Sequence, residues 1–114
     1  MTARALPRIG MLTDRVHYQR REMAREDEGG HVSLYVPVKA LWSRVRPLSA
    51  RAAFEADGRG VAASHVVVTR FRPDVKPGDR FVYRGRNLEV MSAEDMNGRR
   101  AYLSCQCSER AVTG

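Results

Sequence analysis

Cysteine, histidine and acidic side chains are the residues of this sequence that could hold a metal ion or act on a substrate. Cys105 and Cys107 stand in a C-x-C spacing. A strand would place both on one face, without the crossed geometry that a relaxed disulfide requires. A metal site would need two further soft ligands, and the sequence has no second cysteine pair to supply them. We therefore interpret both cysteines as reduced thiols in a cytosolic setting, and as small core residues.

The other reactive residue types form no recognisable catalytic motif. His17, His31 and His65 fall in different segments, and no spacing among them would put two ligands on one helix face. Neighbouring acidic residues, at 26–28 and 94–95, point apart on strands or lie solvated in turns, so they would not converge on one bond. No serine lies in a nucleophile elbow, and no glycine motif leads from a strand into a helix. The sequence therefore predicts no enzyme, no cofactor and no metal ligand.

Arginine is abundant, and its abundance points to an acidic partner. Lys and Arg total 20 against 13 Asp and Glu, which gives a formal net charge of +7, and arginines outnumber lysines 18 to 2. Guanidinium groups suit two-pronged recognition of phosphate or carboxylate. The partner could be nucleic acid or an acidic protein face, and charge alone leaves both open.

Five arginines in the second half of the chain form a candidate basic interface. Two of them share one face of a predicted strand, and two more share one face of another, so neighbouring strands would bring four guanidinium groups to one surface. The strand aromatics alternate onto the opposite face, which favours a solvated or protein-facing surface over one that reads bases. The set is Arg70, Arg72, Arg80, Arg84 and Arg86.

The length and composition fit one globular domain. A chain of 114 residues leaves no room for a second domain with its own core, and 43% hydrophobic with 29% charged residues is typical of a folded chain. No apolar run approaches the roughly 18 residues of a membrane span, and no secretory signal is visible, so we expect no membrane partner. We expect an N-terminal arm over 1–11, a single β domain over 12–109 and a C-terminal tail over 110–114.

The first elements that would position these residues are two strands of a hairpin. Val16 and Tyr18 should face inward on a strand over 16–23, and the acidic run that ends in Gly29 and Gly30 predicts the turn. Apolar residues then alternate with polar ones over 32–39, as in a half-buried strand.

Two residues of this second strand need separate comment. Pro37 cannot donate to a strand ladder, so the strand should lie at an edge or be bulged there. Trp42, with Leu41 and Val45 as neighbours, is expected to be a core anchor.

The second half of the chain predicts further short strands joined by turn residues. A β-branched and aromatic run predicts a strand over 65–72, and the Pro- and Gly-containing segment 73–79 predicts a turn. Tight hairpins are expected at Arg84–Asn87 and at Asn97–Gly98. The fold class that follows is all-β, a small antiparallel barrel or sandwich of about six strands with at most one short helix.

Residues 47–64 differ in kind from these strands. An alanine-rich stretch leads into Gly58 and Gly60, which break regular structure. We expect a long mobile loop. An insertion of this length in so small a domain is often functional, although it can also be a disordered surface connection.

The order of these motifs resembles the tailed-phage head-tail joining proteins, also called head-closure or stopper proteins, including their prophage and gene-transfer-particle relatives. Leu12–Val16 stands in place of the family's opening strand motif. The segment Leu41–Ser49 resembles its tryptophan strand running into Pro-Leu-Ser. The strands at His65–Arg72 and Pro77–Arg86 are similar to its central and Gly-x-Arg strands. The resemblance covers residues 12–109.

The resemblance implies a structural virion protein assembled in the bacterial cytoplasm. Its subunits would form a homo-oligomeric ring below the portal or an adaptor ring, close the DNA channel after packaging and dock a tail-terminator or tail-completion protein, with packaged DNA nearby. The long loop would plug the channel. Its candidate plug residues are Ser49, Arg51, Phe54, Asp57, Gly58, Arg59 and Gly60. The alternative is a small basic β-barrel that binds nucleic acid.

Overall fold

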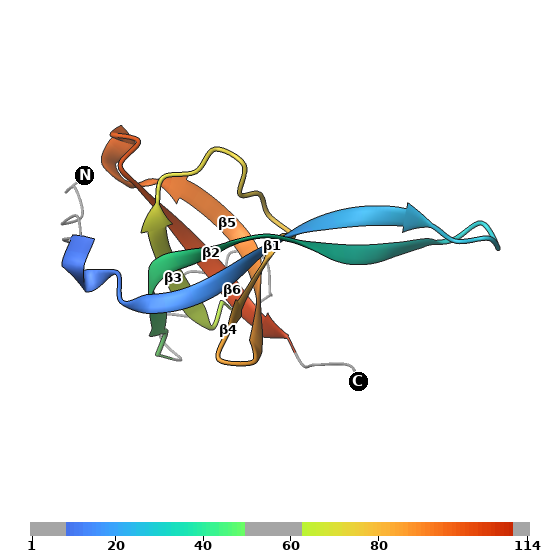
Figure 1. Cartoon of the computed structure of the whole chain (residues 1–114), viewed down its shortest axis with the longest axis horizontal. Coiled ribbons are helices and arrows are strands. Elements are labelled where there is room, and N and C mark those ends of the chain that lie inside the picture. The colour runs from blue at the N-terminus through green and yellow to red at the C-terminus, as the bar shows by residue number, and fades with distance from the viewer. Residues whose placement is uncertain (1–8, 50–62, 111–114) are drawn as a thin grey trace.

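The computed structural model describes residues 9–49 and 63–110, in which six antiparallel strands close into one barrel (Figure 1). The strands are β1 (Asp14–Arg25), β2 (His31–Pro47), β3 (His65–Arg70), β4 (Arg80–Tyr83), β5 (Arg86–Asp95) and β6 (Tyr102–Arg110), and the two short 3-10 helices are η1 (Ile9–Met11) and η2 (Met96–Gly98). Around the barrel the order is β1-β2-β3-β6-β5-β4. The all-β prediction is confirmed, and closure removes the free edges that an open sheet of this size would expose.

Inward-facing side chains fill the barrel. Val16 and Tyr18 of β1 are both buried, as their alternation predicted, and the Tyr18 ring lies 5.7 Å from that of Phe81. Cys105 and Cys107 on β6 are fully buried free thiols, so their interpretation as core residues is confirmed. The remaining buried members of this cluster are Val67, Val75, Leu88, Val90 and Leu103.

A bulge in β2 decides which of its residues face the core. Tyr18 of β1 pairs with Lys39, whereas the next residue, Gln19, pairs with Pro37. Val38 is therefore an extra residue in β2, which is the definition of a bulge. Pro37 has no N–H to give to a ladder, and the irregularity predicted at this position is confirmed.

The expectation that Trp42 anchors the core is wrong. Beyond the bulge, Ser43 is fully buried, and Leu41 and Val45 pack against the core. Because successive residues of a strand point to opposite faces, Trp42 points outward and is 59% exposed. The Arg15 guanidinium lies 5.8 Å from the centroid of its ring.

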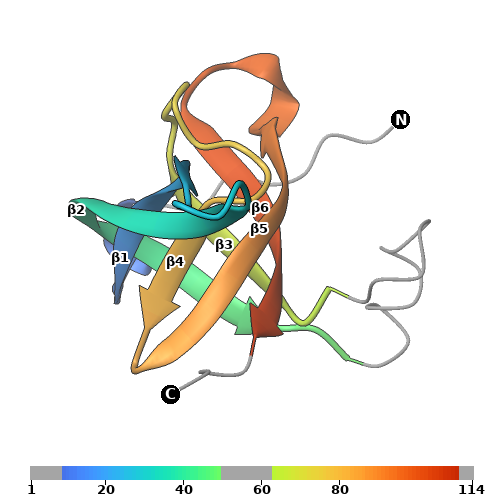
Figure 2. The same cartoon turned by 90° about the vertical axis from the view of Figure 1, so that its right-hand side faces the viewer.

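β1 and β2 extend well beyond the barrel. β4 pairs with β1 across His17–Gln19, and β3 pairs with β2 across Ser43–Pro47. Among the described strands, residues 20–36 pair with one another alone, and we call them the projecting hairpin (Figure 1). Figure 2 views the barrel from the side on which this hairpin projects. The acidic turn predicted at its tip is confirmed by the bond from Glu26 N to Gly30 O, 2.8 Å.

The turns at the other strand ends follow their residue types. Arg84 and Gly85 both have positive φ, 49° and 77°, and form a two-residue hairpin turn between β4 and β5. Asn97 and Gly98 also have positive φ, but they belong to η2 and lead into β6 through a longer connection.

Candidate functional site

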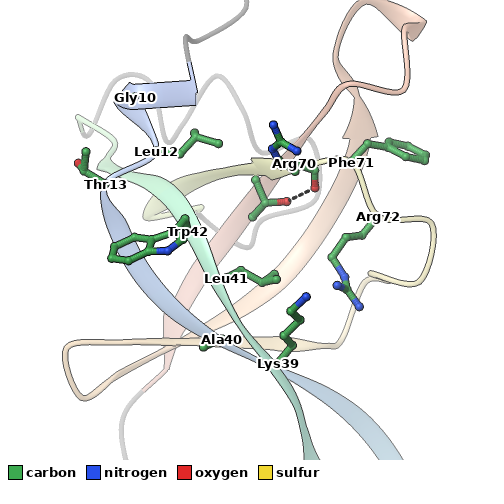
Figure 3. A pocket seen from close by; sticks show the side chains of 11 residues that line it. Gly10, Leu12, Thr13, Lys39, Ala40, Leu41, Trp42, Arg70, Phe71 and Arg72 are labelled. Atoms are coloured by element: carbon green, nitrogen blue, oxygen red, sulfur yellow. Dashed lines mark hydrogen bonds between the residues drawn. The ribbon is translucent and has the colours of Figure 1, made fainter.

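A groove of about 760 Å³ opens beside η1, between the start of β1, the middle of β2 and the end of β3 (Figure 3). Its wall is partly apolar, with Leu12, Leu41 and Phe71, and its rim carries basic side chains. Exposed Trp42 borders it on β2. The lining residues are Gly10, Leu12, Thr13, Lys39, Ala40, Leu41, Trp42, Thr69, Arg70, Phe71 and Arg72.

Two arginines of the predicted basic interface lie at this groove. Arg70 and Arg72 both line it. Arg72 donates from Nε and Nη2 to the two carboxylate oxygens of Asp74, at 3.0 and 2.8 Å. This two-pronged contact lowers the pKa of the Asp74 carboxyl and fixes the guanidinium. The other cationic side chains of the rim are Lys39 and Arg70, and both are exposed.

The other three arginines lie elsewhere, because β3 and β4 are not neighbours. Two strands separate β3 from β4 in either direction around the barrel, so the expectation that they lie side by side is wrong. The Arg80 guanidinium lies 3.8 Å from the centroid of the Tyr35 ring, at the base of the projecting hairpin. Arg84 is in the β4–β5 turn, and Arg86 forms a 3.9 Å ion pair with Glu109. The basic interface stays a prediction, with two of its five members at the groove and the other three elsewhere on the barrel.

Of the seven predicted plug residues, the structure describes Ser49, and the other six lie outside the described residues. The chain is tied together on both sides of that segment. Leu48 N donates to Ser64 O at 2.8 Å, and Ser64 N donates to Cys107 O at 2.8 Å. Ser64 Oγ also accepts a bond from Glu109 N at 2.8 Å. The segment therefore starts and ends at adjacent points of the barrel.

The projecting hairpin has two chemically different faces. The β1–β2 register pairs Glu22 with Leu34 and Ala24 with Val32, so that Val32, Leu34 and Val36 share one face. The Arg20–Glu22 ion pair of β1 lies on this face beside them. Val32 is 40% exposed and Leu34 is 49% exposed. The opposite face carries Arg21, Met23, Arg25, His31, Ser33 and Tyr35.

A buried carboxylate fixes the base of the projecting hairpin. Asp79 is 4% exposed. It accepts bonds from Tyr18 Oη at 2.6 Å, Arg21 N at 3.0 Å and Lys76 N at 2.9 Å. Burial, and then the bond to Asp79, raise the pKa of Tyr18 above its ordinary value, so the phenol remains a donor at neutral pH. These bonds join β1 to the loop before β4 at the point where β1 leaves the barrel.

Within residues 9–49 and 63–110, no three His, Cys, Asp or Glu side chains gather closely enough to hold a metal ion. No helix in the same residues is long and apolar enough to cross a membrane. The groove and the projecting hairpin both expose apolar side chains. They are therefore the surfaces most suited to contact with a macromolecular partner.

The structure thus belongs to a class of small closed antiparallel barrels that carry a long hairpin outside the barrel. Residues 7–110 match the family of phage head completion proteins, and the chain belongs to this family. The resemblance to head-tail joining proteins that the sequence indicated is confirmed. This family is a structural one and not a class of enzymes.

Two solved structures share the fold. A solution structure of a protein from Shigella flexneri 2a aligns with a TM-score of 0.71 and 23% identity, over 92% of this chain and 98% of that one. A chain from the virion of a native gene transfer agent particle aligns with a TM-score of 0.62 and 20% identity, over 84% of this chain and 93% of that one. At these identities the likeness concerns the fold. No curated protein is significantly similar in sequence.

Sequence reasoning missed the groove and the exposed aliphatic face of the hairpin. The alternation over 32–39 predicts a half-buried strand, but β3 and β4 do not extend to residues 20–36, so the apolar face of the hairpin lies outside the barrel. The distance in sequence between the turn at 26–30 and Pro37 indicates a long hairpin. This hairpin is longer than the β4 strand that could pair with it, so part of it must extend beyond the barrel.

Proposed function

We propose that the protein is a structural component of the head-tail connector of a phage or gene-transfer particle. In this proposal a ring of subunits docks beneath the portal or an adaptor ring after DNA packaging, closes the DNA channel and offers its other face to a tail-terminator or tail-completion protein. The observation that carries the proposal is the match of residues 7–110 to phage head completion proteins. The fold shared with a chain of a gene transfer agent virion supports it.

The charge of the chain suits this location. A formal net charge of +7 favours a position next to packaged DNA and against acidic faces of neighbouring rings. Contact with DNA would come from proximity in the channel and would need no base readout. The subunits would be assembled in the bacterial cytoplasm and remain in the virion.

The segment between β2 and β3 is the candidate channel plug. The hydrogen bonds of Ser64 to Leu48 and Cys107 hold its two ends at the barrel. Because its two ends are held in place, the segment that begins after Ser49 can contact the same segment of neighbouring copies in a ring. We propose that these loops together close the channel.

Electron microscopy of purified particles tests the location. A density that fits this barrel between portal and tail supports the proposal, and absence of the chain from purified particles overturns it. In cells that lack the protein, assembly should stop at tailless heads, and these heads should lose their packaged DNA.

A free nucleic-acid-binding barrel is the competing function, and the net charge of +7 is the observation in its favour. Fluorescence anisotropy with labelled duplex DNA distinguishes the two. Tight binding by the isolated protein, with an affinity that falls steeply as salt rises, would favour the nucleic-acid-binding barrel.

A further inference from the structure

The aliphatic face of the projecting hairpin continues the barrel interior but has no sheet packed over it among the described residues. The extra residue of the bulge is in β2, so β1 keeps its alternation, and the side that carries Tyr18 into the core carries Ala24 in the hairpin. Val32 and Leu34 lie on this same face and are largely exposed. An isolated two-stranded hairpin is marginally stable by itself, and an exposed aliphatic patch of this kind marks a contact surface.

The groove offers an apolar surface elsewhere on the molecule. Trp42 is the most exposed large apolar side chain on β2 and borders the groove, whose wall includes Leu41 and Phe71 (Figure 3). η1, beside the groove, and the tip of the hairpin lie at opposite ends of the long axis of the molecule (Figure 1). A hairpin cannot reach the groove of its own subunit in this arrangement, but it can reach that of a neighbour.

The hairpin tip and the groove rim are opposite in charge. Three consecutive acidic residues, Glu26 to Glu28, form the tip of the hairpin, on a chain whose formal net charge is +7. Lys39 and Arg70 are exposed and lie on the rim of the groove. Charge complementarity of this kind orients two surfaces and fixes their register.

We propose that the projecting hairpin of one subunit seats in the groove of the next copy of this chain, with its aliphatic face against Trp42 and its acidic tip toward Lys39 and Arg70. The two contacting surfaces are different, so the contact is head-to-tail, and repeating it generates a ring when the rotation closes. This inference rests on the proposed function, because it assumes the ring of subunits and assigns the contact between them.

A disulfide experiment in purified particles tests this contact directly. Leu34→Cys with Trp42→Cys places one thiol on the hairpin and one at the groove, and both positions are exposed. Oxidation with copper phenanthroline should give a ladder of disulfide-linked multimers of this chain on a non-reducing denaturing gel. The matched control, Leu34→Cys with Ser92→Cys, has its second thiol at an exposed residue of β5 that does not line the groove, and it should stay monomeric.

Three outcomes overturn the proposal. A monomer band from the Leu34/Trp42 pair would show that the hairpin does not reach the groove. A dimer formed by Leu34→Cys alone would show a symmetric hairpin-to-hairpin contact, and a cross-link to another particle protein would show that the hairpin has a different partner. In each case the chain is still found in the particle, so the proposed function stands. Absence of the chain from particles is the separate result that would refute the function.

A charge exchange tests the same contact by activity. Changing Glu26, Asp27 and Glu28 together to Lys, or Lys39 and Arg70 together to Glu, should lower the yield of DNA-filled tailed particles about tenfold, since each set reverses several exposed charge contacts. A chain that carries both sets restores the complementarity, so it should recover most of the yield. Circular dichroism melts verify that each variant is folded. A combined variant no better than the single sets contradicts the proposal.

Discussion

Asp79 is a single side chain that joins two parts of the chain. Its carboxylate accepts bonds from β1, through Tyr18 Oη and Arg21 N, and from the loop before β4, through Lys76 N. The residue is buried, so no water can replace a lost acceptor without opening the structure. The energetic importance of this carboxylate therefore exceeds that of the exposed ion pairs on the surface.

We predict that Asp79→Ala lowers the free energy of unfolding by about 3 kcal/mol, because it leaves buried donors unsatisfied. Glu22→Ala is the matched control. Its 3.5 Å ion pair with Arg20 joins two half-exposed side chains and should contribute no more than about 0.5 kcal/mol. Urea denaturation measures both. Equal effects of the two substitutions would show that the Asp79 bonds do not stabilise the hairpin base.

The cysteines of β6 should be chemically inert in the folded protein. Burial raises the pKa of Cys105 to about 12, and burial with the neighbouring Cys105 raises the pKa of Cys107 well above its usual range. Both remain protonated thiols at neutral pH, and the thiolate is the reactive form. A thiol reagent should label neither in native buffer and both in denaturant.

We also expect Cys105→Ser with Cys107→Ala to lower stability by about 1–3 kcal/mol while leaving head-tail joining intact, because these side chains contribute packing. Thermal melting and complementation measure the two effects. Stoichiometric zinc in the purified native protein would contradict this role.

The projecting hairpin is attached to the barrel at its base, and the rest of it makes no strand pairing with the barrel. Beyond Gln19 its strands pair with each other, and its base is held by Asp79 and by Arg80 packed on the Tyr35 ring. Such an element can be shortened without removing barrel contacts. Its exposed side chains are free to contact a partner.

Replacing residues 22–34 with Asn-Gly keeps the pairing of Arg21 with Tyr35 and closes it with a two-residue turn. The free energy of unfolding should change by less than about 1 kcal/mol, because an isolated hairpin adds little stability, whereas joining should be lost. Ser33→Ala, on the polar face, is the control and should retain joining. Particles that assemble normally with the shortened hairpin would exclude a role for it.

The connection between β2 and β3 gives a second prediction for an element. Replacing Ala52–Ala62 with a short Gly-Ser bridge should leave the fold and docking intact, because the bonds of Ser64 hold the base. It should release packaged DNA from tailless heads, as measured by DNA retention. A Gly-Ser replacement of unchanged length separates the effect of length from that of sequence. Wild-type retention in the shortened variant would refute the plug.

At the scale of the whole molecule, closure of the barrel governs self-association. A closed sheet leaves no strand edge in the barrel for another copy to pair with, and the free strand edges are those of the projecting hairpin. Contacts between barrels must therefore use side-chain surfaces. Contacts of that kind are weak one at a time and become strong when a template holds several copies together.

We therefore expect the isolated protein to be monomeric and to form rings on a portal or adaptor template. Sedimentation velocity in dilute buffer measures this. A stable ring of the isolated protein at micromolar concentration would contradict templated assembly, although it would leave the family membership unchanged.

Local features of the sequence determined the strands, the turns and most of the core. Period-2 alternation placed Val16 and Tyr18 inside, and the residue types over Arg84–Asn87 predicted a tight hairpin, which the structure forms with positive φ at Arg84 and Gly85. These properties depend on residues close together in the chain, which is why sequence alone is sufficient for them. The order of motifs also indicated the family, because it covers nearly the whole chain.

Tertiary structure decided the features that depend on which strands pair and how far. The face of Trp42 follows from where the bulge falls in β2, and that position is set by register against β1. The separation of β3 from β4 follows from the order of strands around the barrel. The projecting hairpin exists because β3 and β4 stop before β1 and β2 do, so the pattern that predicts a buried strand leaves Leu34 in water. Alternation determines which side chains share a face, but the partner strands determine whether that face is covered.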